Sequence, residues 1–295
     1  MAENKKNAPA YYPGALTIGA SDSCGGSGIE ADLRTFNALG VYGCAAVTAV
    51  TAQTPEKIIS SVEMAPETVA AQIEAVISKT AVRCVKTGML CSAGVVEAVA
   101  QMVKKHNLKL ICDPFMMDSS GRKLMTDDAA SKAVSELLPQ ALWVTPNRYE
   151  CESILGRKME TLQEYADGAK ALADKLQTNV LLKCGGDGKL KQAVDLVCYK
   201  GKLFTLSSPK VMFLPDCVFH GAGCTLSAAM TALTALAFSW RDVVLDAKAF
   251  LLGSLQDNVE IGKGVYCMYP PAEDVLDLIE MNDYPPAGGK KKGVR

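Results

Sequence analysis

Short apolar runs alternate with longer segments of helical period along much of this chain, and this alternation constrains the fold most. Six such runs occur, at Ala15–Ala20, Cys44–Ala52, Val82–Met89, Leu108–Pro114, Ala141–Asn147 and Val180–Gly186. The helical segments between them are Ile29–Leu39, Pro66–Ser78, Gly94–Lys105, Asp127–Leu138, Arg148–Leu155 and Thr161–Leu176. Nearly continuous apolar strands separated by helices predict a parallel sheet that helices cover on both faces.

The pattern changes after the sixth run. Residues 193–208, which read AVDLVCYKGKLFTLSS, predict an antiparallel hairpin that turns at Lys200 and Gly201. Three more helices are then expected, at Gly223–Phe238, Arg241–Val259 and Ala272–Ile279. No repeat of fixed period is present, so we expect one α/β domain rather than an array.

The expected domain covers residues 15–282. A segment that we expect to be flexible, residues 1–14, precedes it, and the Gly/Lys-rich residues 283–295 are typical of a disordered tail. With 295 residues, of which 49% are hydrophobic, the chain can build one large core.

Composition argues against several classes of partner. The formal net charge is -1, so no global basic field would attract nucleic acid or an anionic membrane. No apolar run reaches the roughly 18 residues that a membrane span needs. The eleven cysteines include no C-x-x-C pair, and the first residues lack the apolar centre of a secretory signal. These features favour free thiols in a reducing cytoplasm.

The turns that follow the apolar runs carry the functional information, because ligands bind outside the carboxyl ends of strands in open parallel sheets. These turns read SDSCGGSG, QTPEK, TGML, DPFMMDSSG, TPNRYE and KCGGDG. Their Gly, Asp, Asn, Ser and Thr residues predict an active-site rim, although any α/β protein also needs short polar loops in order to turn.

The first glycine-rich turn contains GSGIEA at residues 26–31, which matches the dinucleotide fingerprint G-x-G-x-x-A. Its context differs from that of a dinucleotide site. Residues 20–25 separate the motif from its strand, and no acidic residue ends the second run about 20 residues later. We therefore expect no nicotinamide or flavin here, although the glycines still allow a ligand to approach the backbone closely.

The second glycine-rich turn reads HGAGCTLSA and opens a helix at residues 220–228. Unpaired N–H groups at a helix start form an anion site, and the helix dipole is expected to lower the pKa of the Cys224 thiol. Cys224 could then act as a base, a nucleophile or a metal ligand, or it could simply pack as a small apolar residue. A Cys–His pair with His220 for covalent catalysis is a further alternative.

Taken together, the two turns resemble one family. The stretch ALTIGASDSCGGSGIEADLRTFNALGVYG, followed by TAVTAQ, and the later HGAGCTLSAA are similar to the two end motifs of the hydroxymethylpyrimidine and phosphomethylpyrimidine kinases of thiamin biosynthesis. DPFMMDSSG, TPNRYE and IGKG occur in the expected order. The resemblance covers Ala15 to Gly264. It implies an α/β, ribokinase-like fold with a mostly parallel central sheet flanked by helices on both faces.

The resemblance also implies an activity. The family phosphorylates the hydroxymethyl group of a 4-amino-2-methylpyrimidine with ATP, and then phosphorylates the monophosphate again. Gly221, Ala222 and Gly223 match the family's anion hole, and Cys224 stands where the family carries a cysteine and related sugar kinases carry a catalytic Asp. Cys224 is thereby implied to accept the proton of the alcohol.

Four residues are implied to bind the pyrimidine. Gln53 matches the glutamine that reads the ring, because a carboxamide offers an acceptor and two donors together. Gly19 and Asp32 lie in the first motif, and Met89 resembles a methionine of the pocket wall. Asp32 could equally be a helix-surface charge and Met89 an ordinary core residue.

The nucleotide site is implied by other matches. Asn147 and Glu150 form the N-x-x-E pattern that the superfamily places near Mg²⁺ and the ATP phosphates, with Glu150 acting through water, although the same pattern is ordinary helix capping. Lys183, Gly185, Gly186 and Lys263 match family positions near ATP. The family's habit also suggests a homodimer.

Several residues depart from the family pattern. The usual DPVM-x-x-K-x-G lid is here DPFMMDSSG, with Phe115 for valine and Ser119 where lysine is common, which is expected to weaken closure over the second phosphate. The usual K-G-G is K-C-G-G, so Cys184 could occupy the slot of Lys183. Ala222 replaces a threonine, and VYCMYP follows IGKG where the family has a different sequence.

Two alternatives remain open within this fold. Pyridoxal kinase activity is one, although relatives specialised for it carry a second cysteine in the lid and FMMDSSGRKLM has none. A non-catalytic relative that binds vitamin precursors is the other. Retention of both glycine-rich turns and of Cys224 argues against it.

Overall fold

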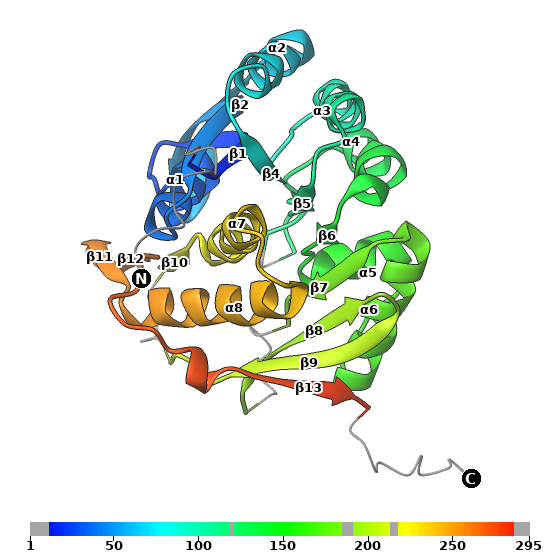
Figure 1. The fold of residues 1–295 in the computed structure, drawn as a ribbon, viewed down its shortest axis with the longest axis vertical. Coiled ribbons are helices and arrows are strands. Elements are labelled where there is room, and N and C mark those ends of the chain that lie inside the picture. Colours follow the sequence, from blue (N-terminus) through cyan, green and yellow to red (C-terminus); the bar gives the residue numbers. More distant parts are fainter. Residues whose placement is uncertain (1–11, 119–120, 185–190, 213–217, 286–295) are drawn as a thin grey trace, which may run out of the picture.

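The computed structural model describes residues 12–118, 121–184, 191–212 and 218–285. Its centre is a ten-stranded sheet (Figure 1). Its strands are β1 (Gly14–Asp22), β2 (Tyr42–Thr54), β3 (Lys57–Glu63), β4 (Val82–Thr87), β5 (Leu110–Cys112), β6 (Trp143–Val144), β7 (Asn179–Leu182), β8 (Ala193–Tyr199), β9 (Lys202–Ser208) and β13 (Glu280–Tyr284).

The order of the strands is β13-β9-β8-β7-β6-β5-β4-β1-β2-β3. The six strands from β7 to β2 in this order pair in parallel, and the strands added at both ends pair antiparallel. The carboxyl ends of the parallel strands therefore meet at one edge, which is where a site is expected.

Helices cover both faces of this sheet, as the alternating pattern predicts (Figure 1). The helices are α1 (Gly28–Ala38), α2 (Pro66–Ile77), α3 (Ala93–His106), α4 (Asp127–Lys132), α5 (Arg148–Leu155), α6 (Leu162–Leu176), α7 (Ala222–Ala235) and α8 (Trp240–Gln256). One apolar core lies under α2 to α6, and a second lies under α1, α7 and α8.

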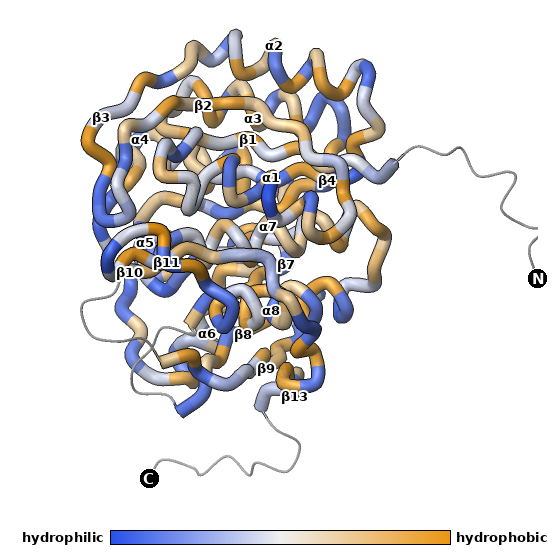
Figure 2. The backbone as a smooth tube through the Cα atoms, turned by 90° about the vertical axis from the view of Figure 1, so that its left-hand side faces the viewer, coloured by the Kyte–Doolittle hydropathy of each residue, from blue (hydrophilic) through white to orange (hydrophobic). Residues whose placement is uncertain are grey.

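The position of a helix decides how much of it is apolar. Figure 2 shows α2 alternating between hydrophilic and hydrophobic residues, because it buries Val69 and Ile73 and presents its other face to solvent. Helix α7 is buried along nearly its whole length, since it packs between α1, α8 and the sheet. This burial holds the start of α7 rigidly at the edge where the parallel strands end.

A second, three-stranded sheet lies beside the first glycine-rich turn. Its strands are β10 (Val218–His220), β11 (Val259–Gly262) and β12 (Val265–Cys267), in the order β10-β12-β11. Strand β10 leads directly into α7 and pairs in parallel with β12. In this pairing His220 lies opposite Cys267. These short strands, β3 and β13 have no clear sequence signal and were not predicted.

Two predicted helices differ from the structure. The segment Asp127–Leu138 is not one α-helix, because α4 ends at Lys132 and continues as a π turn and a 3-10 turn that contains Pro139. The prediction of a helix at Ala272–Ile279 is wrong. This segment forms only a 3-10 turn, Leu276–Leu278, before β13 extends the sheet at its β9 edge and buries Met281.

The other predicted elements are confirmed. The hairpin of β8 and β9 turns at Lys200 and Gly201, and α5 has the predicted bounds. Strand β1 begins at Gly14 and β13 ends at Tyr284, whereas the division of the chain into flexible segment, domain and tail stays a prediction.

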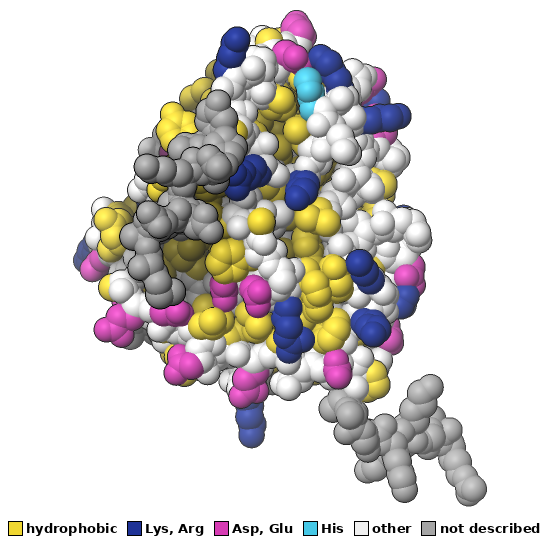
Figure 3. Space-filling view, in the orientation of Figure 1, with side chains coloured by type: hydrophobic (Ala, Val, Ile, Leu, Met, Phe, Trp, Pro, Cys, Tyr) yellow, Lys and Arg dark blue, Asp and Glu magenta, His cyan; other side chains and the backbone are white. Residues whose placement is uncertain are grey.

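The described surface shows no single-sign charge field on the face seen in Figure 3, where Lys, Arg, Asp and Glu side chains are interspersed. This distribution agrees with the net charge of -1. None of the helices that the structure describes is both long and apolar enough to cross a bilayer.

Candidate active site

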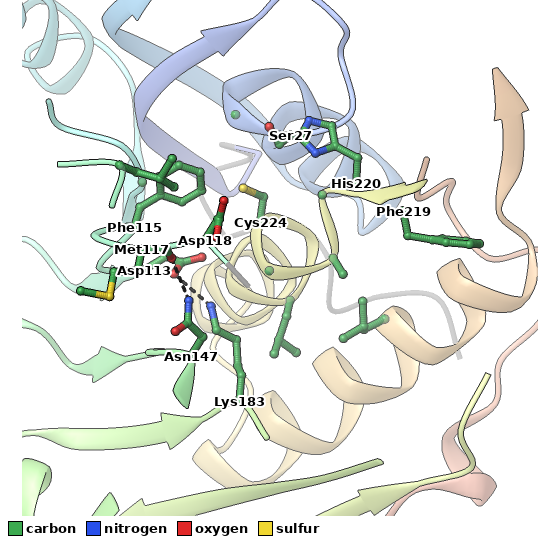
Figure 4. A pocket seen from close by; sticks show the side chains of 18 of the residues that line it. Ser27, Asp113, Phe115, Met117, Asp118, Asn147, Lys183, Phe219, His220 and Cys224 are labelled. Carbon is green, nitrogen blue, oxygen red and sulfur yellow. Dashed lines mark hydrogen bonds and ion pairs between the residues drawn. The ribbon is translucent and has the colours of Figure 1, made fainter. Parts of the chain in front are cut away.

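A cleft of about 1050 Å³ lies at the carboxyl ends of the parallel strands. Its wall combines the first glycine-rich turn, the ends of β2 and β4, the segment after β5, the start of α5, the end of β7 and the first turn of α7. Figure 4 shows Cys224 at the first turn of α7, with Phe115, Met117 and Asp118 on one side and Ser27 and His220 on the other.

The two glycine-rich turns touch each other at Gly221. Gly221 has φ +94°, and a Cβ at this position would lie 1.8 Å from the carbonyl oxygen of Gly26. No other residue type fits such a backbone. The close approach sets the direction in which α7 starts, so that its first N–H groups line the cleft.

The residues that are predicted to form an anion hole lie at this helix start. The first intrahelical bond runs from the Thr225 N–H to the Gly221 carbonyl at 2.9 Å, so the N–H groups of Ala222 and Gly223 precede the helical ladder. A Cβ built on Gly223 would lie 3.4 Å from the Lys183 Nζ atom. Backbone donors and an ammonium group therefore face the same small region, which suits a phosphate.

Cys224 lies in the cleft wall and is 3% exposed. Burial raises the pKa of its thiol to about 11, Lys86 and the N–H of Gly28 lower it, and Asp32 and Asp113 raise it further. The predicted lowering of this pKa is therefore wrong, because removal of the sulfur from water is the largest influence on it. Cys224 is a thiol in the free protein at neutral pH.

Asp22 organises the first glycine-rich turn and was missed by sequence reasoning, although it is the last residue of β1. Its carboxylate accepts hydrogen bonds from the Cys24 and Ser27 N–H groups and the Ser27 hydroxyl, each at 2.9 Å. His220 Nε2 lies 2.8 Å from the same carboxylate. Burial raises the pKa of Asp22, but these hydrogen bonds outweigh it and lower the pKa to about 2.

His220 does not form the alternative Cys–His pair. Its Nε2 atom lies 2.8 Å from Asp22 and 3.1 Å from the amide nitrogen of Gln53. The hydroxyl of Thr51 donates to Gln53 Oε1 at 3.2 Å. His220 therefore lies next to Asp22 and Gln53, and among the described residues it makes no hydrogen bond to Cys224.

Asp32 lies in the cleft wall and forms a buried ion pair that the sequence did not reveal. The Lys86 ammonium lies 2.7 Å from Asp32 Oδ2, and the Thr17 hydroxyl donates to the same oxygen at 2.6 Å. Asp32 and Lys86 are each 1% exposed, so Asp32 is not a helix-surface charge. Burial lowers the pKa of Lys86, but Asp32 and the nearby Cys224 outweigh burial and raise it. A lysine within the apolar run VRCVKTGM was the available signal.

Lys183 directly follows β7 and lines the cleft. Its ammonium lies 3.0 Å from Asp113 Oδ1, as the dashed line in Figure 4 marks. Ser227 Oγ lies 3.3 Å from Asp113 Oδ2. Burial lowers the pKa of Lys183, but Asp113 and Glu150 outweigh burial and raise it.

Cys184 has a different role from the one its register suggested. Its N–H donates to Asp195 Oδ1 at 2.8 Å, and the Lys248 ammonium lies 2.7 Å from Asp195 Oδ2. Of these two neighbouring residues, Lys183 is the one whose side chain lies near Gly223.

Asn147 and Glu150 form a capping box that also holds the segment after β5. Glu150 Oε1 accepts from the Met116 N–H and Oε2 from the Asn147 N–H, both at 2.8 Å. The Asn147 amide donates to the Met117 carbonyl at 2.8 Å (Figure 4). Burial raises the pKa of Glu150 to about 7. Backbone N–H groups therefore donate to both oxygens of this carboxylate.

The remaining predicted residues are distributed as follows. Gly19 and Met89 line the cleft, together with Gln53. Lys263 is exposed in the turn between β11 and β12 and is not among the cleft-lining residues that the structure describes. Gly185, Gly186 and Ser119 lie outside the described residues.

Phe115 lies in the segment after β5. It lines the cleft and has φ +49°, which is uncommon for an aromatic residue. No cluster of three or more His, Cys, Asp or Glu side chains that could hold a metal occurs within the described ranges.

Comparison with known proteins decides the family. The sequence profile described as phosphomethylpyrimidine kinase matches residues 22–269. The chain belongs to this family. The hydroxymethylpyrimidine/phosphomethylpyrimidine kinase of Rhizobium meliloti is 39% identical to it over 253 residues, which cover 85% of this chain and 94% of that protein. The predicted resemblance is thereby confirmed.

Solved structures of relatives confirm the fold. Phosphomethylpyrimidine kinase from Clostridium difficile is 32% identical, with a TM-score of 0.71 over 81% of this chain and 97% of that chain. An ADP complex of Bacillus subtilis pyridoxal kinase is 30% identical, with a TM-score of 0.78 over 88% of this chain and 97% of that chain. The phosphomethylpyrimidine kinase family thus shares the mostly parallel sheet and the helices on both faces.

Proposed function

We propose that this phosphomethylpyrimidine kinase family member uses ATP to phosphorylate 4-amino-5-hydroxymethyl-2-methylpyrimidine, and then its monophosphate, in thiamin biosynthesis. The names of its relatives support this function. The observation that carries it is the start of α7, where the backbone donors of the anion hole, the Lys183 ammonium and the Cys224 sulfur line one cleft.

The chemical step is an in-line transfer. The hydroxymethyl oxygen attacks the γ-phosphorus of ATP, an O–P bond forms, and the bond to the bridging oxygen of ADP breaks. The N–H groups of Gly221, Ala222 and Gly223 stabilise the charge on the transferred group. The alcohol proton passes to Cys224 in its thiolate form. Since a thiol with a pKa of about 11 is rarely ionised at neutral pH, positioning supplies much of the rate.

The acceptor binds on the side of the cleft formed by Gly19, Asp32, Gln53 and Met89. Gln53 suits the ring, because its amide can donate to a ring nitrogen while it accepts from the neighbouring amino group. The hydroxyl of Thr51 donates to Gln53 Oε1 at 3.2 Å, and Gln53 and His220 line the same cleft.

The nucleotide binds on the opposite side, near Asn147, Lys183 and the segment containing Gly185 and Gly186. Relatives of known structure bind ADP, which supports ATP as the phosphate donor. Lys263 is proposed to approach the nucleotide from the β11–β12 turn. A magnesium ion bound with ATP would offset the charge of the phosphates, and Glu150 with Asp113 would face its waters, because Mg²⁺ retains several waters in such sites.

We place the protein in the cytoplasm as a homodimer. The ten described cysteines are all free, as expected of a reducing compartment. Apolar side chains are exposed on the β2–β3 edge, where Tyr42, Val50, Ile59 and Val62 are each at least half exposed, and a second copy would cover them.

Pyridoxal is the second candidate acceptor. A specific observation favours it, namely the similarity to Bacillus subtilis pyridoxal kinase in both structure and sequence. Pyridoxal also carries a hydroxymethyl group on a flat ring, so the same transfer geometry would serve.

A coupled assay of ADP formation with each acceptor tests the proposal. Faster turnover of the hydroxymethylpyrimidine supports it, whereas faster turnover of pyridoxal would overturn the choice of substrate. No turnover of either compound would favour a non-catalytic binding protein. Separate assays of the first and second phosphorylation would show whether the altered lid, with Phe115 and Ser119, supports both steps.

A further inference from the structure

The proposed function leaves one buried group without a role, the Lys86 ammonium. Lys86 belongs to β4, Asp32 to α1 and Cys224 to the first turn of α7, and these three elements pack against one another. All three side chains line the cleft, and none is more than 3% exposed. A lysine is almost never this buried without a specific reason.

The ion pair is a poor stabilising element. Asp32 Oδ2 accepts from both Lys86 and Thr17, whereas Asp32 Oδ1 is buried and has no hydrogen-bond partner among the described residues. A buried ion pair offsets its desolvation only when its remaining atoms are also satisfied. This pair is therefore retained at a cost in stability, which points to a function.

The function follows from the charge that must appear nearby. Cys224 accepts a proton only as a thiolate, and burial opposes the formation of this anion. Coulomb attraction to Lys86 favours the thiolate and repulsion from Asp32 opposes it. We propose that the buried Lys86–Asp32 pair is a positioning device for Cys224: the ammonium stabilises the negative charge that forms on the sulfur, and the carboxylate holds the ammonium in place.

Two further charged side chains and one backbone N–H group also act on the thiolate of Cys224. Asp113, from the segment after β5, opposes the thiolate, and Lys183, from the end of β7, favours it. The N–H of Gly28, from the first glycine-rich turn, donates to the sulfur. Lys183 forms its ion pair with Asp113, on the side proposed for the nucleotide, whereas Lys86 forms its ion pair with Asp32, on the side proposed for the acceptor.

The test measures the thiolate of Cys224 without any substrate. Wild-type protein and variants are alkylated with iodoacetamide between pH 7 and 10, and the peptide containing Cys224 is quantified by mass spectrometry. We expect Lys86→Met to slow alkylation about tenfold or more at a given pH, and Asp32→Asn to accelerate it by a similar factor, because one pKa unit changes the thiolate fraction about tenfold.

The protein provides a matched control. Lys248→Met and Asp195→Asn make the same changes in the other buried Lys–Asp pair of this cleft, which is satisfied by the Cys184 N–H. We expect both control variants to alkylate Cys224 at the wild-type rate. Lys86→Arg, which keeps the charge, should stay within about threefold of wild type.

Circular dichroism establishes which variants are folded. If Lys86→Met does not fold, the double variant Asp32→Asn/Lys86→Met removes both charges together, and its alkylation rate should fall about tenfold or more below that of Asp32→Asn, because the ammonium is lost as well. An unchanged rate in folded Lys86→Met, or shifts of Lys86→Met and Asp32→Asn in the same direction, would overturn the proposal.

This inference rests on the proposed role of Cys224, but its test is independent of turnover. Opposite shifts in alkylation without kinase activity would retain the ion-pair device and overturn the proposed function. Normal kinase activity with unchanged alkylation rates would retain the proposed function and overturn the proposed role of the ion pair.

Discussion

Two buried Lys–Asp pairs line the same cleft, and they differ in how completely they are satisfied. Lys86–Asp32 and Lys248–Asp195 have the same separation, 2.7 Å, and nearly the same burial. In the second pair the other carboxylate oxygen, Asp195 Oδ1, accepts the Cys184 N–H at 2.8 Å, whereas Asp32 Oδ1 has no described partner.

The difference separates a structural pair from a functional one. Asp195 joins β8 to the end of β7 and to α8, so it fixes the backbone next to Lys183. Asp32 accepts from no backbone group within the described ranges, and it instead holds the Lys86 charge near Cys224. Complete hydrogen bonding stabilises a fold, while an incompletely satisfied buried charge is kept for the field it exerts.

The largest expected effect removes the group on which Lys86 acts. Cys224→Ala should fold normally and lose about a thousandfold in kcat, because general base catalysis contributes about 10²–10⁴-fold. Binding of hydroxymethylpyrimidine, measured by calorimetry, should persist. Near-native turnover would show that neither Cys224 nor the ion pair beside it takes part in the reaction.

Neutralising the two lysines should separate the two pairs kinetically. Lys86→Met is expected to lower kcat about a hundredfold with little change in the KM for ATP, because the thiolate loses its cation. Lys248→Met is expected to act chiefly on the KM for ATP, since it loosens the backbone at Cys184. Steady-state kinetics with both substrates measures these effects. Identical changes of kcat and KM in the two variants would show that the two Lys–Asp pairs do not differ in role.

The pH dependence reports the same thiol. The pKa of Cys224 is raised to about 11 by burial, so the active thiolate fraction increases with pH. We expect kcat/KM to rise about tenfold per unit between pH 7 and 10. Cys224→Asp, whose carboxylate is ionised throughout this range, should flatten the rise. A flat wild-type profile would contradict the proposed role of the Cys224 thiolate as the base.

Truncation of the ring-reading amide should have a smaller effect. Gln53→Ala is expected to raise the KM for hydroxymethylpyrimidine about tenfold, since one or two hydrogen bonds are lost, and to leave the KM for ATP unchanged. An unchanged pyrimidine KM would show that the ring is read elsewhere on the acceptor side.

Asp22 extends the comparison to a fully hydrogen-bonded carboxylate. Its pKa is lowered to about 2, so it contributes stability that is present above about pH 4 and lost as the pH falls toward 2. Thermal unfolding of Asp22→Asn at pH 7 should show a loss of about 2 kcal/mol, and the difference from wild type should shrink below pH 4. A constant difference across this range would contradict the assignment.

Much of the fold could be read from local patterns. The hairpin at Lys200 and Gly201 and the helix Arg148–Leu155 carry strong turn and capping signals, and the structure confirms both. Strand β13 could not be predicted, because Glu280–Tyr284 forms a strand only through pairing with β9. The apolar period of Ala272–Ile279 suggested a helix that this pairing overrides.

The sequence alone determined the parallel sheet, the two glycine-rich turns and the cysteine at the start of α7, because these depend on local periodicity and on residues close in the chain. Only the tertiary structure decided what surrounds that cysteine. Burial raises its pKa against the helix dipole, His220 pairs with Asp22 instead of the thiol, and Lys86 meets Asp32 beneath it. Desolvation and charge proximity arise from segments far apart in sequence, and no local pattern records them.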